Sequence, residues 1–167
     1  MDIQKELIAE FDREVVKTRK IFEAIPADVD FNYQPHPKSM SLGRLAGHIS
    51  ETAGQWAVST LNLDKLEFPA GHKFEAYIPT NKETLLADFD KSAAESKAAL
   101  ANFAPEKWDE NWKFGMGGQV WIDDSKYGVF RNWVLDHMVH HRAQLGVYLR
   151  LLDKPIPGSY GPSADEM

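Results

Sequence analysis

Three histidines have the residue type and the spacing of metal ligands. His137 and His141 are four residues apart within an apolar stripe, so a helix projects both from one face. Side chains at this spacing have Cβ atoms about 5–6 Å apart, close enough for both imidazoles to reach one ion at about 2.0–2.1 Å. His48 lies near the middle of an earlier apolar stripe and is the natural third ligand. Three imidazoles on two facing helices predict a divalent metal site that keeps a position open to water or substrate.

The same histidines have a second interpretation, in which they only fill the core. A single histidine on an apolar helix face is usually just hydrogen-bonded there. Two histidines in one stripe are harder to explain in this way, because each unsatisfied buried polar group costs about 1–3 kcal/mol. Both interpretations remain open from the spacing alone.

Three further residues are candidates for proton transfer or substrate orientation. Glu51 follows His48 by three residues, so it is placed either to hydrogen-bond a ligand imidazole or to act as a base, with an exposed ion pair as its competing role. His140 is one position off the apolar stripe and is placed to orient water or substrate from beside the site. Tyr160, in the C-terminal tail, is the third candidate catalytic residue.

Several familiar site types are excluded by residue type. The chain has no cysteine, which removes disulfides, thiolate nucleophiles and iron–sulfur clusters. A zincin motif requires Glu after its first histidine, and here that position is Met138. The glycine run 115–118 lacks both the dinucleotide-binding spacing and the lysine of a phosphate-binding loop, so it is expected to be a turn.

Composition narrows the class of protein and its partners. With 43% hydrophobic and 26% charged residues in 167, the chain has the balance of one globular domain, spanning residues 1–167. The chain has 25 acidic and 19 basic residues. This acidic balance argues against a nucleic-acid partner, because a protein that binds nucleic acid needs a basic surface. No stretch approaches the roughly 20 apolar residues of a membrane helix, and the first residues are too charged for a signal peptide, so a cytoplasmic location is expected.

Apolar periodicity predicts the elements that position these residues. Steps of three and four residues indicate four helices, and a capping box at Thr80 and Glu83 is expected to start the third. Alternation around the glycine run predicts a short hairpin or flap within residues 108–124. The fold expected is therefore all-α, a four-helix bundle with long crossover connections, with the tail 155–167 packed on its surface. The four helices are expected over residues 3–25, from a cap at Ser39 or Ser41 to about residue 63, over 81–104 and over 126–152.

Two segments resemble the DinB-like superfamily, which includes the YfiT-like proteins. They are Ser41-Leu-Gly-Arg-Leu-Ala-Gly-His48 and, above all, Asp136-His-Met-Val-His-His-Arg-Ala-Gln-Leu-Gly-Val-Tyr-Leu-Arg150 with the Pro- and Gly-containing tail behind it. The resemblance implies a DinB/YfiT-type four-helix bundle in which His48, His137 and His141 bind a divalent ion. Zinc or nickel is typical of the family, with iron and manganese as further candidates, and homodimers are common. The name of the family does not imply DNA binding.

The resemblance also sets the expected functions. Relatives include thiol transferases that use low-molecular-weight bacterial thiols, thiol-dependent isomerases, and members associated with metal-dependent hydrolysis. We expect a metal-dependent enzyme that activates water or such a thiol, a thiol S-transferase or hydrolase acting on a small molecule. The alternative is a non-catalytic stress-response or binding module with a structural or absent metal, and a plain dimerising bundle is a third option. Trp56 and Trp133 are expected in the core or a pocket wall, with the aromatic residues of the flap as a lid.

Overall fold

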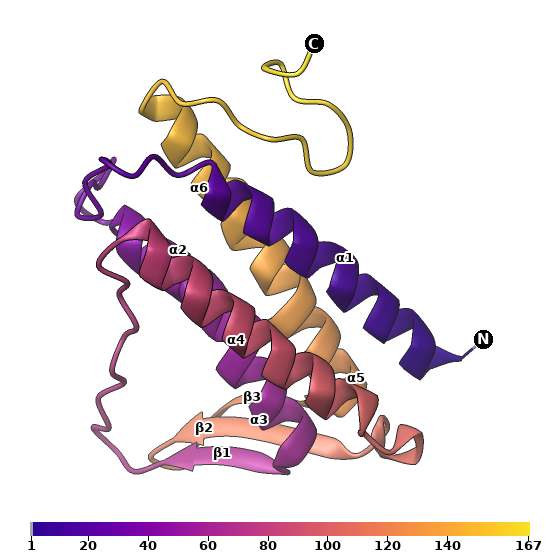
Figure 1. The fold of residues 1–167 in the computed structure, drawn as a ribbon. Helices are drawn as coiled ribbons and strands as arrows, with labels where there is room; N and C mark the ends of the chain where they lie inside the picture. Colours follow the sequence, from indigo (N-terminus) through magenta and orange to yellow (C-terminus); the bar gives the residue numbers. More distant parts are fainter. Residues whose placement is uncertain (1) are drawn as a thin grey trace.

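Helices make up most of the chain and lie side by side along one common direction (Figure 1). The structure, a computed structural model, describes residues 2–167. The helical elements are α1 (Ile3–Glu23), α2 (Leu42–Glu51), the π-helical η1 (Thr52–Trp56), α3 (Ala57–Asn62), α4 (Lys82–Ala101), the short 3-10 helix η2 (Pro105–Lys107), α5 (Lys126–Val129), the π-helical η3 (Phe130–Asp136) and α6 (His137–Leu151).

Two of the helical stretches are composite. Elements α2, η1 and α3 follow one another without a break, as do α5, η3 and α6, so each stretch contains a π-helical insertion near its middle. Segments of this kind are rare and are frequent at functional sites. The bundle therefore has four long helical stretches, close to the four that periodicity predicts.

Side-chain caps begin each of these stretches. The side chains of Asp2, Ser41 and Ser125 accept hydrogen bonds from backbone N–H groups in the first turns of α1, α2 and α5. The cap of α4 is Asn81, whose Oδ1 accepts from the Thr84 N–H at 2.8 Å. The predicted capping box at Thr80 is thus one residue early. Asn is as good an N-cap as Ser or Thr, and here its backbone is extended as the cap position requires.

A long connection sets the topology of the bundle. After α3 and the first strand, residues 69–81 run back along the outside of the bundle from the sheet to the start of α4 (Figure 1). This return lets α2 and α4 run in the same direction, while α1 and α6 run the opposite way. We call residues 69–81 the strap.

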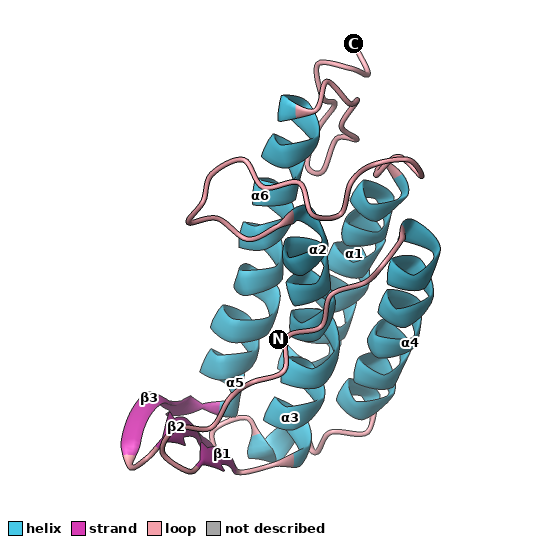
Figure 2. Ribbon diagram, turned by 90° about the vertical axis from the view of Figure 1, so that its left-hand side faces the viewer, coloured by secondary structure: helices cyan, strands magenta, loops and turns pink. Residues whose placement is uncertain are grey.

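A three-stranded sheet lies at one end of the bundle (Figure 2). Its strands are β1 (Lys65–Phe68), β2 (Asn111–Met116) and β3 (Gln119–Ser125), in the order β1-β2-β3. Strand β2 pairs antiparallel with β3 and parallel with β1. The prediction of an all-α fold is therefore wrong. The alternating segment 108–124 forms two strands of a mixed sheet, and β1 was missed because its hydrogen-bonding partners lie far along the chain.

The hairpin turn explains two of the glycines. Met116 pairs with Gln119, so Gly117 and Gly118 alone make the turn, with φ of 60° and 83°. Two-residue hairpin turns with positive φ at both positions favour glycine, because a side chain is strained there.

Two apolar clusters stabilise the helical bundle and the sheet. The larger lies between the helices and includes Phe11, Phe22, Phe89, Leu45 and Leu145. The smaller joins Trp112, Phe114 and Ile122 of the hairpin to Val129 of α5, with Trp56 and strand β1 packed against it. Among the residues that the structure describes, no helix combines the length and apolar character that a membrane span requires.

Candidate metal centre

The three predicted histidines meet between α2 and α6. One ring nitrogen from each of His48, His137 and His141 lies within 4.8 Å of the other two. The Nε2 atoms of His48 and His137 are 3.3 Å apart, although 89 residues separate them in the chain. The three ring centroids are 4.7 to 4.9 Å from one another. We call these residues the histidine cluster.

The two π-helical segments lie directly next to this cluster. Segment η1 begins four residues after His48, and η3 ends immediately before His137. They pack against each other, and the Trp56 ring of η1 stacks on the Trp133 ring of η3 with centroids 6.1 Å apart. The Trp133 ring in turn meets His137 edge to face at 5.8 Å. The two π-helical segments thus place a pair of stacked tryptophan rings on one side of the histidine cluster.

Hydrogen bonds orient two of the three rings. His48 Nδ1 lies 3.0 Å from Glu51 Oε2, and His141 Nδ1 lies 2.7 Å from Gln144 Oε1. Both acceptors place the ring proton on Nδ1, which leaves the Nε2 lone pair free. The same arrangement of a carboxylate or amide oxygen behind an imidazole orients ligand histidines in metal sites.

Burial favours the neutral form of His137 and His141. Burial lowers the pKa of His141 to about 4, against the opposing hydrogen bond to Gln144. Burial also lowers the pKa of His137, and the neighbouring His48 lowers it further, while the Trp133 carbonyl opposes the shift. Neutral imidazoles are the form that coordinates a metal ion.

The donor set fits a divalent metal ion. Within residues 2–167, the buried Nδ1 of His137 has no hydrogen bond of regular geometry. With the His48 proton on Nδ1, the Nε2 lone pair of His48 points at His137 Nε2, 3.3 Å away, and a bound cation would engage both nitrogens. Three imidazole nitrogens on two helices correspond to the protein ligands of sites that keep a coordination position for substrate.

Glu51 is held by more than His48. Its Oε1 accepts the Tyr77 N–H at 2.8 Å, and its Oε2 accepts from Arg44 Nη2 at 2.9 Å. Burial by itself raises the pKa of Glu51, but hydrogen bonds from His48, Tyr77 and Arg44, together with the charge of Arg44, hold that pKa below its usual value. A carboxylate stabilised in this way is a weak base and a firm support for the His48 ring.

The other two candidate residues lie at different distances from the cluster. The His140 ring is 4.8 Å from that of His141, and its Nε2 accepts from the Gln144 amide at 3.1 Å, so it stands at the exposed edge. The Tyr160 hydroxyl instead bonds to Glu14 and Arg142, both at 2.9 Å. The structure therefore brings Glu51 and His140 beside the cluster, and uses Tyr160 to join the tail to α1 and α6.

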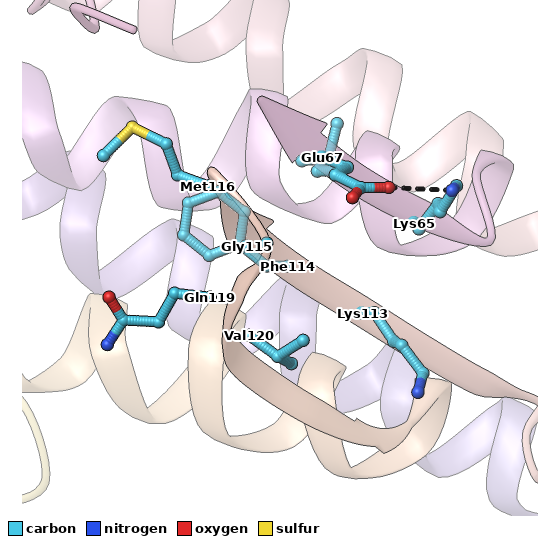
Figure 3. Close-up of a pocket in the computed structure, with 10 residues that line it drawn as sticks. Lys65, Glu67, Lys113, Phe114, Gly115, Met116, Gln119 and Val120 are labelled. Carbon is cyan, nitrogen blue, oxygen red and sulfur yellow. Dashed lines mark hydrogen bonds and ion pairs between the residues drawn. The ribbon is translucent and has the colours of Figure 1, made fainter. Parts of the chain in front are cut away.

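A cavity of about 650 Å³ opens beside the histidine cluster. His48 and Glu51 line it, together with Arg44, Trp56, residues of the strap and side chains of the sheet. A second, smaller cavity of about 130 Å³ lies over the sheet between Lys65, Glu67 and the hairpin, and includes none of the three histidines (Figure 3). The larger cavity is thus the one that can bring a substrate to the cluster.

Comparison with known proteins assigns the chain to a family. The model of the DinB family matches residues 1–167. The chain belongs to the DinB family. Among curated proteins, none matches it.

Solved structures of DinB-like proteins share the fold. A DinB-like protein from Bacillus cereus is 20% identical, with a TM-score of 0.70 over 93% of this chain and 97% of that one. One from Bacillus subtilis is 18% identical, with a TM-score of 0.68 over 92% and 96%. A third, described as a DinB-family member from Exiguobacterium sibiricum, is 22% identical, with a TM-score of 0.64 over 100% and 99%. At these identities the likeness concerns the fold.

Three residues around the cluster of this DinB-family protein were missed by sequence reasoning. Gln144 follows His141 by three residues, the spacing that drew attention to Glu51 after His48, so its role had a signal in the sequence. Arg44 likewise precedes His48 by one helical turn. Tyr77 lies in an irregular segment, where no periodicity indicates which backbone group meets Glu51.

Proposed function

We propose that this DinB-family protein is a divalent-metal-dependent enzyme that activates water or a low-molecular-weight thiol. His48, His137 and His141 would hold the ion. The observation that carries the proposal is the convergence of three imidazoles, two of them oriented by Glu51 and Gln144, at the wall of a cavity of about 650 Å³. Zinc and nickel suit an all-imidazole donor set, and so do iron and, more weakly, manganese.

The bound ion would supply Lewis acidity, which lowers the pKa of a coordinated water or thiol and makes it a nucleophile near neutral pH. The chain itself does the positioning. Glu51 and Gln144 hold the rings of His48 and His141 in one tautomer and one orientation. The stacked Trp56 and Trp133 rings lie on one side of the site, with Trp56 in the cavity wall and Trp133 37% exposed.

Two substrate types fit this chemistry. The chain has no cysteine, so any thiol nucleophile must come from a small-molecule substrate. In thiol transfer the sulfur loses its proton, attacks an electrophilic carbon and displaces a leaving group. In hydrolysis water takes the place of the thiol. His140, at the exposed edge of the cluster, is the proposed partner for the released proton.

A non-catalytic module with a structural metal is the competing function. It predicts a closed, coordinatively saturated site, or histidine rings hydrogen-bonded to carboxylates, with no cavity beside them. The hydrogen bond between His48 and Glu51 fits the second form of this prediction. His48 and Glu51 line the large cavity, and this observation favours the enzyme.

Metal analysis tests the proposal first. The protein, purified without an affinity tag, is reconstituted with Zn²⁺ or Ni²⁺, desalted and analysed by mass spectrometry beside His48→Ala, His137→Ala and the control His36→Ala. His36 lies in the exposed loop before α2, away from the cluster. We expect about one ion per chain in the wild type and the control, and loss in the other two. Equal metal content in all four proteins would overturn the assignment.

Turnover by the metal-loaded protein tests the enzymatic part. p-Nitrophenyl acetate reports hydrolysis, and 1-chloro-2,4-dinitrobenzene with free cysteine reports thiol transfer, with His137→Ala as the inactive control. Stoichiometric metal without turnover on these and wider electrophile panels would favour the binding module. We also propose that residues 1–167 form a single domain and that the protein is a homodimer. Light scattering measures the molar mass in solution and so tests the homodimer.

A further inference from the structure

Aromatic residues are a large share of the wall of the large cavity, six of its fifteen lining residues besides His48. They come from three separate parts of the chain: η1, the sheet with β1 to β3, and the strap. The six aromatic residues that line it besides His48 are Trp56, Phe68, His72, Phe74, Phe114 and Trp121. We call them the aromatic wall.

The rings meet mainly by their edges. Phe114 lies at the centre of the wall, with ring centroids 5.3 Å from Trp56 and 5.1 Å from Trp121, both edge to face. Phe68 meets Phe74 edge to face at 5.0 Å and stacks on His72 at 4.4 Å. Edge-to-face contacts among the rings leave aromatic faces directed away from their neighbours, and such faces stack well against a further flat ring.

Two members of the wall are unusually exposed for aromatic side chains. Phe74 keeps 52% and Trp121 42% of its surface accessible. Scattered single apolar side chains on a surface are ordinary, but these two face the same hollow beside buried rings. A concave apolar surface with a few polar groups at its base has the usual character of a small-molecule site, and its volume falls within the typical range of about 300–1,000 Å³.

The strap that carries Phe74 is fixed to the bundle. The Tyr77 N–H donates to Glu51, and the Tyr77 hydroxyl donates to Asp88 of α4. Pro79 is buried, and Gly47 of α2 lets the strap backbone approach closely: a Cβ at Gly47 would lie 2.1 Å from the Tyr77 carbonyl oxygen. These contacts fix the end of the strap, three residues after Phe74, and the wall residues of η1 and the sheet belong to regular elements. Most of the wall is therefore preformed, which reduces the entropy lost when a ligand binds.

The charges around the cavity are balanced. Arg44 is paired with Glu51, and the neighbouring strap residues Lys73 and Glu75 are of opposite sign. Neither an anion nor a cation is favoured by a surplus of charge, so apolar and aromatic contacts decide which ligand binds.

The wall leads to the histidine cluster. His48 lines the same cavity as Phe74 and Phe114, and Trp56 joins the wall to Trp133, which touches His137. The wall and His48 thus share one cavity, so a ligand bound against the wall lies in the space that His48 also lines.

We infer that the aromatic wall binds a planar aromatic group of the substrate and presents the adjoining reactive atom to the histidine cluster. This substrate class rests on the proposed function, whereas binding of the aromatic group depends only on the cavity. In thiol transfer or hydrolysis the aromatic group belongs to the electrophile.

Binding of 2-naphthalenemethanol tests this inference. The control is its decahydro analogue, which keeps the carbon skeleton and the hydroxyl but has no aromatic ring. Titration of ¹⁵N-labelled protein followed by NMR reports both affinities, and the Trp side-chain N–H signals report the place. We expect the signals of Trp56 and Trp121 to move, and that of Trp108, which is buried and bonded to Gln4, to stay.

Variants separate the wall from general apolar binding. Phe74→Ala and Trp121→Ala should each weaken binding by about two- to tenfold, the effect of one aromatic contact. Tyr127→Ala, an exposed ring outside the cavity, should leave affinity unchanged. Absence of binding, equal affinity for the decahydro analogue, or equal affinity in all variants would overturn the inference.

The metal-ligand variant keeps the two proposals distinguishable. His137 does not line the cavity, so His137→Ala should bind 2-naphthalenemethanol as the wild type does. Naphthalenemethanol binding in a protein that holds no metal would refute the proposed function but not the aromatic site. Metal binding without naphthalenemethanol binding would refute only the aromatic site.

Discussion

The carboxylate of Glu51 joins the strap to the histidine cluster: its Oε1 accepts the Tyr77 N–H at 2.8 Å while its Oε2 lies 3.0 Å from His48 Nδ1. One side chain thus orients a ring of the histidine cluster and holds the strap that forms part of the cavity wall. A substitution at Glu51 should therefore affect both the orientation of the His48 ring and the attachment of the strap.

Replacing Glu51 by Gln should weaken metal binding. The amide is close in size, but it loses the charge that stabilises the His48 Nδ1–H, and loss of such a support typically costs about 10- to 100-fold in metal affinity. Competition with a chromogenic chelator measures the Zn²⁺ dissociation constant. Glu75→Gln, in the same cavity but without a hydrogen bond to the cluster, is the matched control. An unchanged dissociation constant in Glu51→Gln would show that the contact to His48 has no part in metal binding.

Gly47→Ala should displace the strap. The added Cβ would lie 2.1 Å from the Tyr77 carbonyl oxygen, and backbone cannot yield as a flexible side chain does. Overpacking of this kind costs about 1–3 kcal/mol of unfolding free energy. Urea unfolding measures it, with Gly161→Ala as control because no atom lies within 4 Å of its Cβ position. Equal stability of the two variants would contradict close packing of the strap on α2.

The buried pair of Glu14 and Arg142 should behave as a unit. Arg142 Nη2 lies 2.6 Å from Glu14 Oε2, and both residues are almost fully buried. Arg142→Leu removes the buried charge partner of the carboxylate and leaves only Lys17, whose Nζ lies 2.8 Å from Glu14 Oε1. The loss should approach the roughly 3–5 kcal/mol of a broken buried ion pair. The double variant Glu14→Leu/Arg142→Leu should be less destabilised than Arg142→Leu alone, as urea unfolding will show. Additive losses would exclude coupling between the two residues.

The same pair should give a pH-dependent stability. Burial opposes ionisation of Glu14, but hydrogen bonds from Lys17, Arg142 and Tyr160 lower its pKa below 4.5. A carboxyl with a lowered folded-state pKa contributes stability that is fully present above about 4.5 and is lost as the pH falls through the folded-state pKa. The stability difference between wild type and Glu14→Gln should therefore be constant near pH 7 and shrink below pH 4.5. Thermal unfolding from pH 7 to 3 measures it, and a pH-independent difference would refute the linkage.

Asp165 should hold the C-terminal tail in place. It accepts from Arg150 at 2.6 Å and from the Ile156 N–H at 2.8 Å, and these hydrogen bonds lower its pKa to about 2. Asp165→Asn should speed proteolysis within residues 155–167 at neutral pH. The control is Asp153→Asn, which makes the same charge change beside the tail. The Asp153 side chain has no hydrogen bond within residues 2–167, so this variant should be cleaved at the wild-type rate. Equal cleavage of both variants would show that Asp165 does not anchor the tail.

Local patterns in the sequence predict the helices and the pairing of two of the three histidines in the cluster. Period and caps depend on residues a few positions apart, so α1, α4 and the two composite helices lie close to their predicted ranges. The pairing of His137 with His141 follows from the helical repeat alone, and so does the position of Glu51 one turn after His48. What the repeat does not specify is which helix faces which.

Contacts between distant segments are decided by the tertiary structure. Strand β1 is four residues long, too short for a periodic signal, and becomes a strand because the edge of β2 satisfies its backbone hydrogen bonds. Tyr160 was expected near the site, but the buried charges of Glu14 and Arg142 provide stronger partners for its hydroxyl.

The sequence by itself determined the ligand types, their helical spacing and the absence of a protein thiol, because these depend only on residue identity and on the local repeat. Only the tertiary structure decided that His48 meets His137 across 89 residues, and that the strap and the sheet build an aromatic cavity beside them. Such contacts depend on how whole elements pack and on how long connections return, and no short stretch of sequence specifies either.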